Sequence, residues 1–207
     1  MFRIGFLVSG NGTNFQAVVD NINNEYIKNV EIITLVSNNP NSYALERAKK
    51  NNIDCLCIDK KDFESNEFYE DYLINHFKTK NVDLIVMAGF MVVIGKKFVD
   101  AFKNKIINIH PSLIPSFCGK GYYGLKVHKA VIEKGVKVTG ATVHFVTEET
   151  DAGPIILQKA VNVEDNDTPE ILQERVMKQA EWIILPEAIK LLSEYKIEIV
   201  RNIVRRK

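Results

Sequence analysis

The sequence lacks any apolar run of about 18 residues, the length that a membrane-spanning helix requires. It also lacks an excess of charge of either sign, because 27 Lys and Arg stand against 26 Asp and Glu and leave +1 at pH 7. Bulk electrostatics therefore predicts neither a nucleic acid nor an anionic membrane as a partner. Residues 1–8 are typical of a strand, without the small-residue cleavage site of a signal peptide. We therefore expect a cytoplasmic protein.

Cysteine is scarce, with three residues in the chain, and this odd number fits a reducing compartment. Cys55 and Cys57 alternate along a short predicted strand, and no matching Cys or His pair lies near them in the sequence. The four histidines also lack the close spacing of zinc ligands. Cys118 lies in a polar loop without a nearby base, so we do not expect a nucleophile there. We expect no metal cofactor.

What the chain does contain is an ordinary globular composition, with 46% hydrophobic and 26% charged residues. No segment has the composition of a linker, so we expect a single domain over residues 1–207. The basic residues near the carboxyl terminus, Arg201, Arg205, Arg206 and Lys207, are expected to be the solvated end of a helix or strand.

Strand and helix patterns alternate along the chain, which predicts an α/β fold with a doubly wound, mostly parallel, Rossmann-like sheet and late strands that run antiparallel. The predicted strands are 2–8, 30–36, 54–58, 82–88, 105–109, 138–146 and 155–163. The predicted helices are 14–24, the segment after the turn 37–42 through 51, a segment ending near 80, 124–134, and 168–194 with an interruption near Pro186.

The first predicted strand ends in Ser9-Gly10-Asn11-Gly12-Thr13-Asn14, and a helix follows directly. Two glycines let the backbone approach a ligand closely, and free amides at a helix start favour an anion such as phosphate. Phe15 stands where a dinucleotide fingerprint has its third glycine, and no Lys-Ser or Lys-Thr pair completes a P-loop. From these residues alone, a tight turn capped by Asn11 or Thr13 and a phosphate-monoester site both stay open.

The best candidate for chemistry is Asn108-Ile109-His110-Pro111, at the end of an apolar strand. Side chains alternate along a strand, so Asn108 and His110 share a face. Pro111 cannot donate to a sheet, so the strand should stop there, at the carboxyl end where open α/β sheets bind ligands. An imidazole with a pKa of about 6.5 can accept and donate a proton at neutral pH, and the amide can donate a hydrogen bond to a developing oxyanion.

The acidic loop 148–154 supplies a carboxylate that could serve His110. Asp151 precedes Ala-Gly-Pro at a strand boundary, where a side chain can be held rigidly. An Asp paired with His110 would favour the imidazolium and fix the orientation of the ring. The other histidines are expected in structural positions: His76 and His128 on helix surfaces, and His144 within a strand.

Three motifs together resemble one family: Ser-Gly-Asn-Gly-Thr-Asn after the first strand, Asn-Ile-His-Pro-Ser-Leu-Ile-Pro in the middle, and Val-His-Phe-Val-x4-Asp-Ala-Gly-Pro later. Through nearly its whole length the chain resembles the phosphoribosylglycinamide formyltransferases of purine biosynthesis. The middle and later motifs are shared by the wider folate-dependent formyltransferase superfamily. The first motif and the chain length separate it from methionyl-tRNA formyltransferase and formyltetrahydrofolate deformylase, which have a further domain.

The resemblance implies transfer of a formyl group from 10-formyltetrahydrofolate to the amine of 5-phosphoribosylglycinamide, in the route to IMP and without a metal. By motif position it implies a catalytic trio of Asn108, His110 and Asp151. Asn108 and protonated His110 would stabilise the tetrahedral oxyanion, while Asp151 would keep His110 charged.

The resemblance also implies binding residues for both substrates. The phosphate is expected on Gly12, Thr13 and Asn14, with Lys178 near the phosphate and Glu181 at the ribose. The folate contacts are expected to be Asn66, Met91, Val92, Val93, Ile94, Asn108, Thr147, Glu148, Glu149 and Thr150. Asn66 and Val92 depart from the pattern, because relatives often place an arginine at each position.

Two other functions remain open. One is a hydrolytic relative that delivers the formyl group to water, and the other is a phosphosugar- or nucleotide-binding module without catalysis. The loop 116–124 is either a lid or a long surface loop. We expect small-molecule substrates as the only partners, in a monomer or a homodimer.

Overall fold

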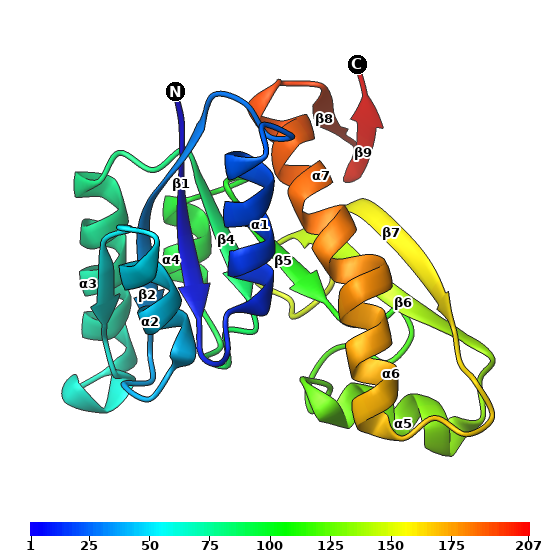
Figure 1. Cartoon of the computed structure of the whole chain (residues 1–207). Helices are drawn as coiled ribbons and strands as arrows, with labels where there is room; N and C mark the ends of the chain where they lie inside the picture. The colour runs from blue at the N-terminus through cyan, green and yellow to red at the C-terminus, as the bar shows by residue number, and fades with distance from the viewer. The chain divides into compact units, whose positions relative to one another are not determined.

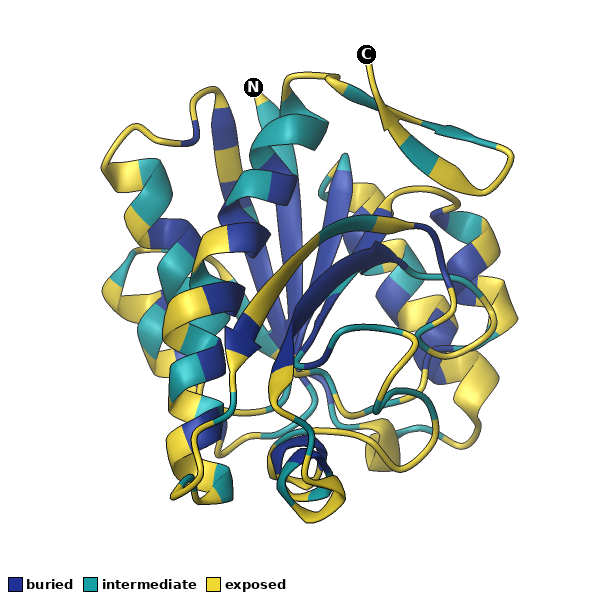
Figure 2. Cartoon of the chain, turned by 90° about the vertical axis from the view of Figure 1, so that its right-hand side faces the viewer, coloured by how far each residue is buried: buried dark blue, intermediate teal, exposed yellow.

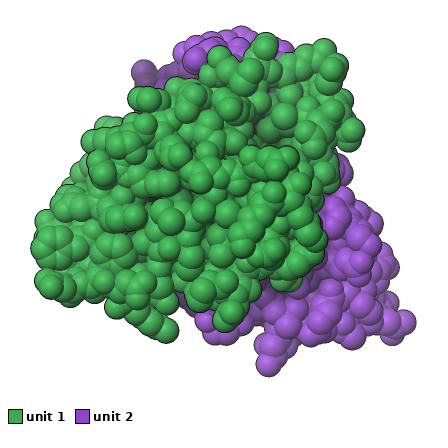
Figure 3. All heavy atoms as spheres, turned by 60° about the vertical axis from the view of Figure 1, so that its left-hand side comes forward, with its two compact units in different colours: residues 1–107 green, residues 108–207 purple.

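The computed structural model describes residues 1–207, which divide into two compact units, residues 1–107 and 108–207 (Figure 3). The strands of the first unit are β1 (Phe2–Val8), β2 (Val30–Ser37), β3 (Cys55–Cys57) and β4 (Leu84–Ala88). Its helices are α1 (Thr13–Asn23), α2 (Tyr43–Lys50), the short 3-10 helix η1 (Lys60–Asp62), α3 (Asn66–Thr79) and α4 (Lys96–Ala101).

The strand β5 (Ile106–His110) runs across the boundary between the units. The remaining strands are β6 (Val138–Phe145), β7 (Ile155–Asn162), β8 (Ile197–Val200) and β9 (Ile203–Arg206). The remaining helices are α5 (Leu125–Lys134), α6 (Pro169–Val176), the π-helical segment η2 (Met177–Glu181) and α7 (Trp182–Ser193).

Hydrogen bonds order seven of the strands as β3-β2-β1-β4-β5-β6-β7, and β8 pairs with β9 (Figure 1). The pairs β1–β2, β1–β4 and β2–β3 are parallel, whereas β6–β7 is antiparallel. The predicted α/β fold with a mostly parallel sheet and late antiparallel strands is therefore confirmed.

The first unit forms its sheet from strands that are apolar along most of their length. All five residues of β4 and the last five residues of β1 are buried, as expected for parallel strands covered on both faces (Figure 2). Right-handed crossovers place α1 and α2 on one face of this sheet and α3 on the other. The strand order reverses at β1, so the loops after β1 and β4 lie at the switch point where such sheets bind ligands.

In the second unit, α6, η2 and α7 follow one another and pack against β6 and β7. The sequence predicts one helix over 168–194 with an interruption near Pro186. The predicted position of the interruption is wrong. Pro186 lies inside α7, while the irregularity is the π-helical turn Met177–Glu181. Thr168 caps α6 through a bond from the amide of Ile171, as the sequence signal predicted.

Several elements have no counterpart in the sequence prediction. The helices η1 and α4 have three and six residues, too few for a clear apolar period, and the strands β8 and β9 form a hairpin that carries the basic residues of the carboxyl terminus. No helix combines the length and the apolar character that crossing a bilayer demands.

Candidate active site

The strand β5 delivers Asn108 and His110 to its carboxyl end. The strand ends at His110, immediately before Pro111, as the sequence predicts. The side chain of His110 is buried, with 4% of the residue exposed, and Asn108 is half-buried. A titratable ring is thus held on the end of a rigid element and largely shielded from water.

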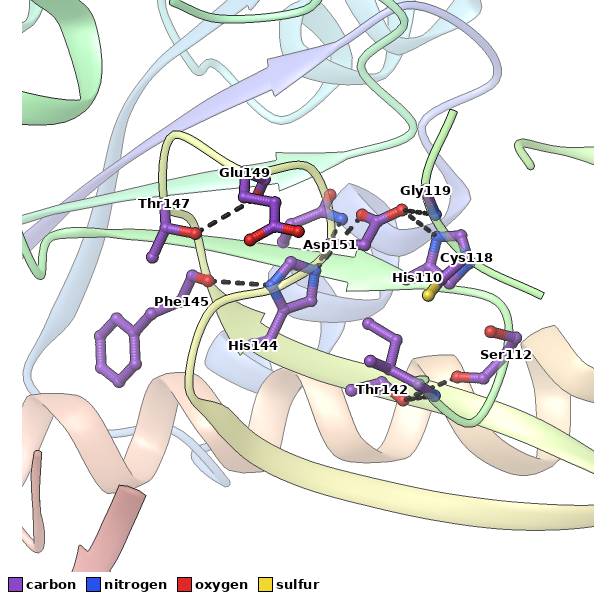
Figure 4. Close-up of polar contacts among 12 residues, drawn as sticks. His110, Ser112, Cys118, Gly119, Thr142, His144, Phe145, Thr147, Glu149 and Asp151 are labelled. Atoms are coloured by element: carbon purple, nitrogen blue, oxygen red, sulfur yellow. Dashed lines mark hydrogen bonds and ion pairs between the residues drawn. The ribbon is translucent and has the colours of Figure 1, made fainter. Parts of the chain in front are cut away.

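Asp151 lies between two imidazoles (Figure 4). Its Oδ2 atom is 3.7 Å from Nδ1 of His110, and its Oδ1 atom is 3.6 Å from Nε2 of His144. The amide of Gly119 donates to Oδ2 at 2.8 Å. Asp151 itself has a left-handed backbone with φ of 56°, which fixes the turn that carries the carboxylate. The structure therefore brings Asp151 to His110, the partner that the sequence proposed for it.

The neutral form of His110 carries its proton on Nε2. That nitrogen lies 2.9 Å from the carbonyl oxygen of Phe117, which can only accept a hydrogen bond. Burial lowers the pKa of His110, and His144 lowers it further; the bond to Phe117 and the charge of Asp151 raise it but do not offset burial. The resemblance implies a protonated ring beside Asp151; burial acts against that form, whereas Asp151 and the carbonyl of Phe117 act for it.

The carboxylate of Asp151 is ionised. Burial alone would raise its pKa, but the contact with His144, the charge of His110 and the amide of Gly119 together lower it. The cluster thus combines a fixed negative charge with a ring that can accept one proton at Nδ1. A proton arriving there forms an ion pair with Asp151.

The loop after β1, residues 9–14, is shaped by a left-handed glycine. Gly12 has φ of 68° and is the N-cap of α1. A Cβ atom on Gly12 would lie 2.6 Å from Cβ of Ala44, so glycine is required for space as well as for backbone shape. The loop leads into the first turn of α1, where Thr13 and Asn14 are half-buried.

The helix α2 holds the carbonyl groups of this loop. The carbonyl of Gly10 accepts from Oγ of Ser42 at 2.7 Å and from the amide of Ala44 at 3.2 Å. The carbonyl of Asn11 accepts from Nε of Arg47 at 2.8 Å. A trans peptide points its N–H opposite to its carbonyl, so the amides that follow these carbonyls are turned away from α2. This arrangement leaves donors rather than acceptors on the side of the loop that faces away from α2.

The predicted folate segment follows β4 and is hydrogen-bonded to the loop after β1. The amide of Met91 donates to Oγ of Ser9 at 2.8 Å, and the amide of Ser9 donates to the carbonyl of Gly89 at 3.1 Å. Met91 and Val93 are exposed by 51% and 74%. Val92 is half-buried and Ile94 is buried, so Ile94 offers a ligand only its backbone.

Asn66, the predicted contact of the folate tail, is the first residue of α3 and is exposed. Its side-chain amide donates to Oε1 of Glu70 at 2.7 Å, and the amide of Gly95 donates to the same oxygen at 2.8 Å. Glu70 is 3% exposed. This buried carboxylate therefore anchors both Asn66 and the end of the predicted folate segment.

The remaining predicted contacts lie in the second unit. In the loop after β6, Thr147 donates to the carbonyl of Glu149 at 3.1 Å, and Glu148, Glu149 and Thr150 are exposed. Lys178 pairs with Glu174 on the helix surface, whereas Glu181 is 6% exposed. Both Lys178 and Glu181 lie in the π-helical segment, a geometry that is frequent at functional sites. No cluster of three or more His, Cys, Asp or Glu side chains has the arrangement of a metal site.

A sequence profile described as "Formyl transferase" matches residues 2–189. The chain belongs to the formyl transferase family. The resemblance predicted from the three motifs is confirmed at this level.

Individual relatives of this formyl transferase agree with the profile. It is 37% identical over 203 residues to "Phosphoribosylglycinamide formyltransferase" of Haemophilus influenzae, covering 98% of this chain and 92% of the relative. It is 40% identical over 197 residues to "Trifunctional purine biosynthetic protein adenosine-3" of Gallus gallus, covering 95% of this chain. The chain spans 19% of the length of that trifunctional relative.

The structure is also similar to that of "glycinamide ribonucleotide transformylase 1 from Symbiobacterium toebii". The TM-score is 0.93 at 40% sequence identity, over 100% of this chain and 94% of the other. The likeness therefore extends over the whole of this formyl transferase, including the hairpin β8–β9.

Two histidines of this formyl transferase differ from the other candidates. His144 was expected to be a core or cross-strand residue, and it is indeed buried on β6; it also contacts Asp151 and lies 3.2 Å from Nδ2 of Asn108. His128 was expected on a helix surface, but it is fully buried and neither ring nitrogen has a hydrogen-bond partner. Burial, with a smaller effect of His110, lowers the pKa of His128 to about 4. The signal for His144 was available, because it lies seven residues before Asp151 within the same family motif.

Arg47 also escaped the sequence prediction. A charged residue on an amphipathic helix predicts a solvated surface, and nothing in its spacing points to a loop 36 residues earlier. The contact follows from tertiary packing of α2 beside the loop. Burial and the charge of Asp151 raise the pKa of the Cys118 thiol, which lowers its reactivity as a nucleophile.

Proposed function

We propose that this formyl transferase moves the formyl group of 10-formyltetrahydrofolate onto the amine of 5-phosphoribosylglycinamide, giving the N-formylated product and tetrahydrofolate. The observation that carries the proposal is the buried cluster of His110 and Asp151 beside Asn108, at the end of β5. A base paired with a carboxylate and next to an amide donor suits acyl transfer to an amine. The names and near-complete coverage of the Haemophilus influenzae and Symbiobacterium toebii proteins support the same assignment.

The proposed reaction begins with attack of the acceptor amine on the formyl carbon. The new carbon–nitrogen bond leaves a negative charge on the formyl oxygen, to which Nδ2 of Asn108 donates. The amine loses a proton to Nδ1 of His110, the nitrogen that the bond to Phe117 leaves free. The resulting imidazolium faces Asp151 and then returns the proton to N10 of the folate as the old carbon–nitrogen bond breaks.

The loop after β1 is the proposed phosphate site of the acceptor. Its carbonyls are turned toward α2, and it opens the N-terminus of α1, so that Gly12, Thr13 and Asn14 offer backbone donors to an anion. We assign Lys178 a phosphate contact and Glu181 a ribose contact. A hydrolase would have no phosphorylated acceptor to hold, so this loop favours transfer over hydrolysis to water.

The donor folate is proposed to contact Met91, Val92, Val93 and Ile94, Asn66, Asn108, and the loop from Thr147 to Thr150. The exposed side chains of Met91 and Val93 offer apolar contact to an aromatic ring, and the backbone of Ile94 offers hydrogen bonds. We propose that the amino-terminal half of a single formyl transferase domain holds the acceptor phosphate and that the carboxyl-terminal half completes the folate and catalytic sites. We place this reaction in the cytoplasm, without a metal.

Formyl transfer is tested by following the conversion of the folate spectroscopically, with and without phosphoribosylglycinamide. We expect turnover only when the acceptor is present, together with formylated product in equal amount. Turnover without the acceptor would identify a hydrolase. Absence of turnover in both cases, with both ligands still bound, would identify a binding module.

A further inference from the structure

His144 is fixed in one tautomer by its own strand. It lies on β6 and is 2% exposed, and its Nδ1 atom is 2.9 Å from the carbonyl oxygen of Phe145 (Figure 4). A carbonyl oxygen can only accept, so the proton of the neutral ring lies on Nδ1. The other nitrogen, Nε2, is then a hydrogen-bond acceptor.

The neighbour that uses this acceptor is Asn108. Its Nδ2 atom lies 3.2 Å from Nε2 of His144, within hydrogen-bond distance, whereas Oδ1 of Asp151 lies at 3.6 Å. A neutral ring with its proton on Nδ1 satisfies both the carbonyl of Phe145 and the amide of Asn108. A ring with its proton on Nε2 satisfies neither, and its proton would face the more distant carboxylate of Asp151 instead.

We propose that His144 is a positioning residue that sets which way the side-chain amide of Asn108 faces. An asparagine amide has two orientations that exchange Nδ2 with Oδ1, and only a nitrogen can donate to a developing oxyanion. The acceptor on His144 holds Nδ2 by one of its N–H groups and leaves the other for the formyl oxygen. In the opposite orientation, Oδ1 would face the nitrogen lone pair of His144.

The groups around His144 explain why a histidine serves here. Asp151 contributes a negative charge on one side, His110 lies on the far side of that carboxylate, and Asn108 completes the polar surroundings. If the proton of His144 lay on Nε2, that nitrogen would donate toward Asp151 and would repel Nδ2 of Asn108. The amide would then turn its oxygen toward the ring. The tautomer with its proton on Nδ1 is therefore the one that holds the oxyanion donor in place.

The proposal rests on the proposed formyl transfer, so one of its tests does not depend on activity. Nitrogen-15 NMR of the whole protein, with histidine labelled, reports which ring nitrogen carries the proton. We expect a protonated Nδ1 and an unprotonated Nε2 for His144 at neutral pH. A proton on Nε2, or on both nitrogens, overturns the proposal even if the enzyme is fully active.

Two matched amide variants separate positioning from packing. In His144→Gln the side-chain oxygen falls near the place of Nε2 and can accept from Asn108, whereas in His144→Asn the nitrogen falls near Nδ1 and keeps only the contact with Phe145. We expect His144→Gln to retain kcat within about fivefold and His144→Asn to lose about 10- to 100-fold, within the range for loss of an oxyanion donor or its support. The KM for each substrate should change by less than about threefold, because ground-state binding does not use the oxyanion contact.

Circular dichroism and thermal unfolding establish that both variants are folded. Equal kcat for the two folded variants overturns the proposal, as does a loss that appears in KM alone. If neither variant folds, the tautomer measured in the unmodified protein decides. An unmodified protein that binds both substrates but transfers no formyl group would instead contradict the proposed function, whatever the tautomer of His144.

Discussion

The two halves of the chain prepare for a substrate by different means. In residues 1–107 the proposed phosphate loop, residues 9–14, is formed by peptide groups, whose orientation depends on the left-handed Gly12 and on hydrogen bonds from α2. In residues 108–207 the cluster around Asp151 is formed by ionisable side chains that are mostly buried. The geometry of the loop therefore depends on backbone conformation. The chemistry of the cluster depends on which side-chain atoms carry protons. Substitutions in the first half should change binding of the acceptor, whereas those in the second should change the rate and the response to pH.

The largest effect is expected from His110→Ala, which removes the proton acceptor of the cluster. We expect kcat to fall by at least about 100-fold, and toward about 1000-fold, while the fold is retained, because the residue lies at the end of its strand. Steady-state kinetics with both substrates measures the change. Cys118→Ala is the matched control, since that thiol lies near Asp151 without a proposed role, and it should keep its turnover. Near-normal turnover in His110→Ala would exclude the proposed mechanism.

His128 allows the pH dependence of the second half to be measured as stability. Its pKa is lowered to about 4, so the folded protein resists protonation there while the unfolded chain takes up a proton near pH 6.5. Stability is thus unaffected above pH 6.5 and is lost as the pH falls from 6.5 toward 4. On acidification to pH 4, the free energy of unfolding of His128→Leu should therefore fall by about 3 kcal/mol less than that of the unmodified protein.

Urea unfolding at pH 7 and at pH 4 measures this difference. The half-buried His76 offers a comparison in the first half, because burial and Lys80 also lower its pKa. His76→Leu should change the acid loss less than His128→Leu does. If the unmodified protein and His128→Leu lose equal stability on acidification, His128 is not the buried group that we describe.

The dependence of the first half on backbone shape is tested by Gly12→Ala against Gly10→Ala. Alanine at residue 12 would adopt a left-handed conformation and meet Ala44, whereas a Cβ on Gly10 meets nothing within 4 Å. Left-handed strain of about 1–2 kcal/mol predicts a rise of about tenfold in the KM for the acceptor in Gly12→Ala. The KM for the folate should be unchanged, and Gly10→Ala should match the unmodified enzyme. Equal effects of the two variants would contradict the role given to Gly12.

The smallest effect is expected from Arg47→Ala, which removes a hydrogen bond between α2 and the loop after β1. Loss of this hydrogen bond to the loop, worth about 0.5–1.5 kcal/mol, predicts a rise of about two- to twelvefold in the KM for the acceptor. Lys50→Ala is the control, because Lys50 lies on the same helix and contacts Tyr43 but not the loop. A change in kcat at saturating acceptor, with an unaltered KM, would mean that Arg47 acts elsewhere.

The fold was largely predictable because buried parallel strands appear in the sequence as short apolar runs. β1 and β4 are such runs, and both were predicted within a few residues of their observed bounds. Elements without that signal were missed or misplaced. The helix α4 is one turn and a half long, and the irregularity before α7 comes from a π-helical turn rather than from Pro186.

The site residues were predictable where a sequence motif identifies them. They were not predictable where only tertiary packing brings them together. Asn108 and His110 stand two residues apart on one strand, so their shared face follows from strand geometry alone. His144 looks like any alternating residue of a strand until Asp151 folds back beside it, and Arg47 looks like a surface charge until α2 packs beside the loop. The family motif places His144 seven residues before Asp151 but does not state that the two side chains meet, and no local spacing encodes the contact of Arg47.

The π-helical turn Met177–Glu181 has a consequence for how the chain can vary. A π-helical turn holds one residue more than an α-helical turn. Removing one residue from it would therefore restore a regular helix and leave the buried side chains of α7, Ile184, Leu185, Ala188 and Ile189, in register. Such a deletion would instead change the directions of Lys178 and Glu181, the residues that the turn itself carries.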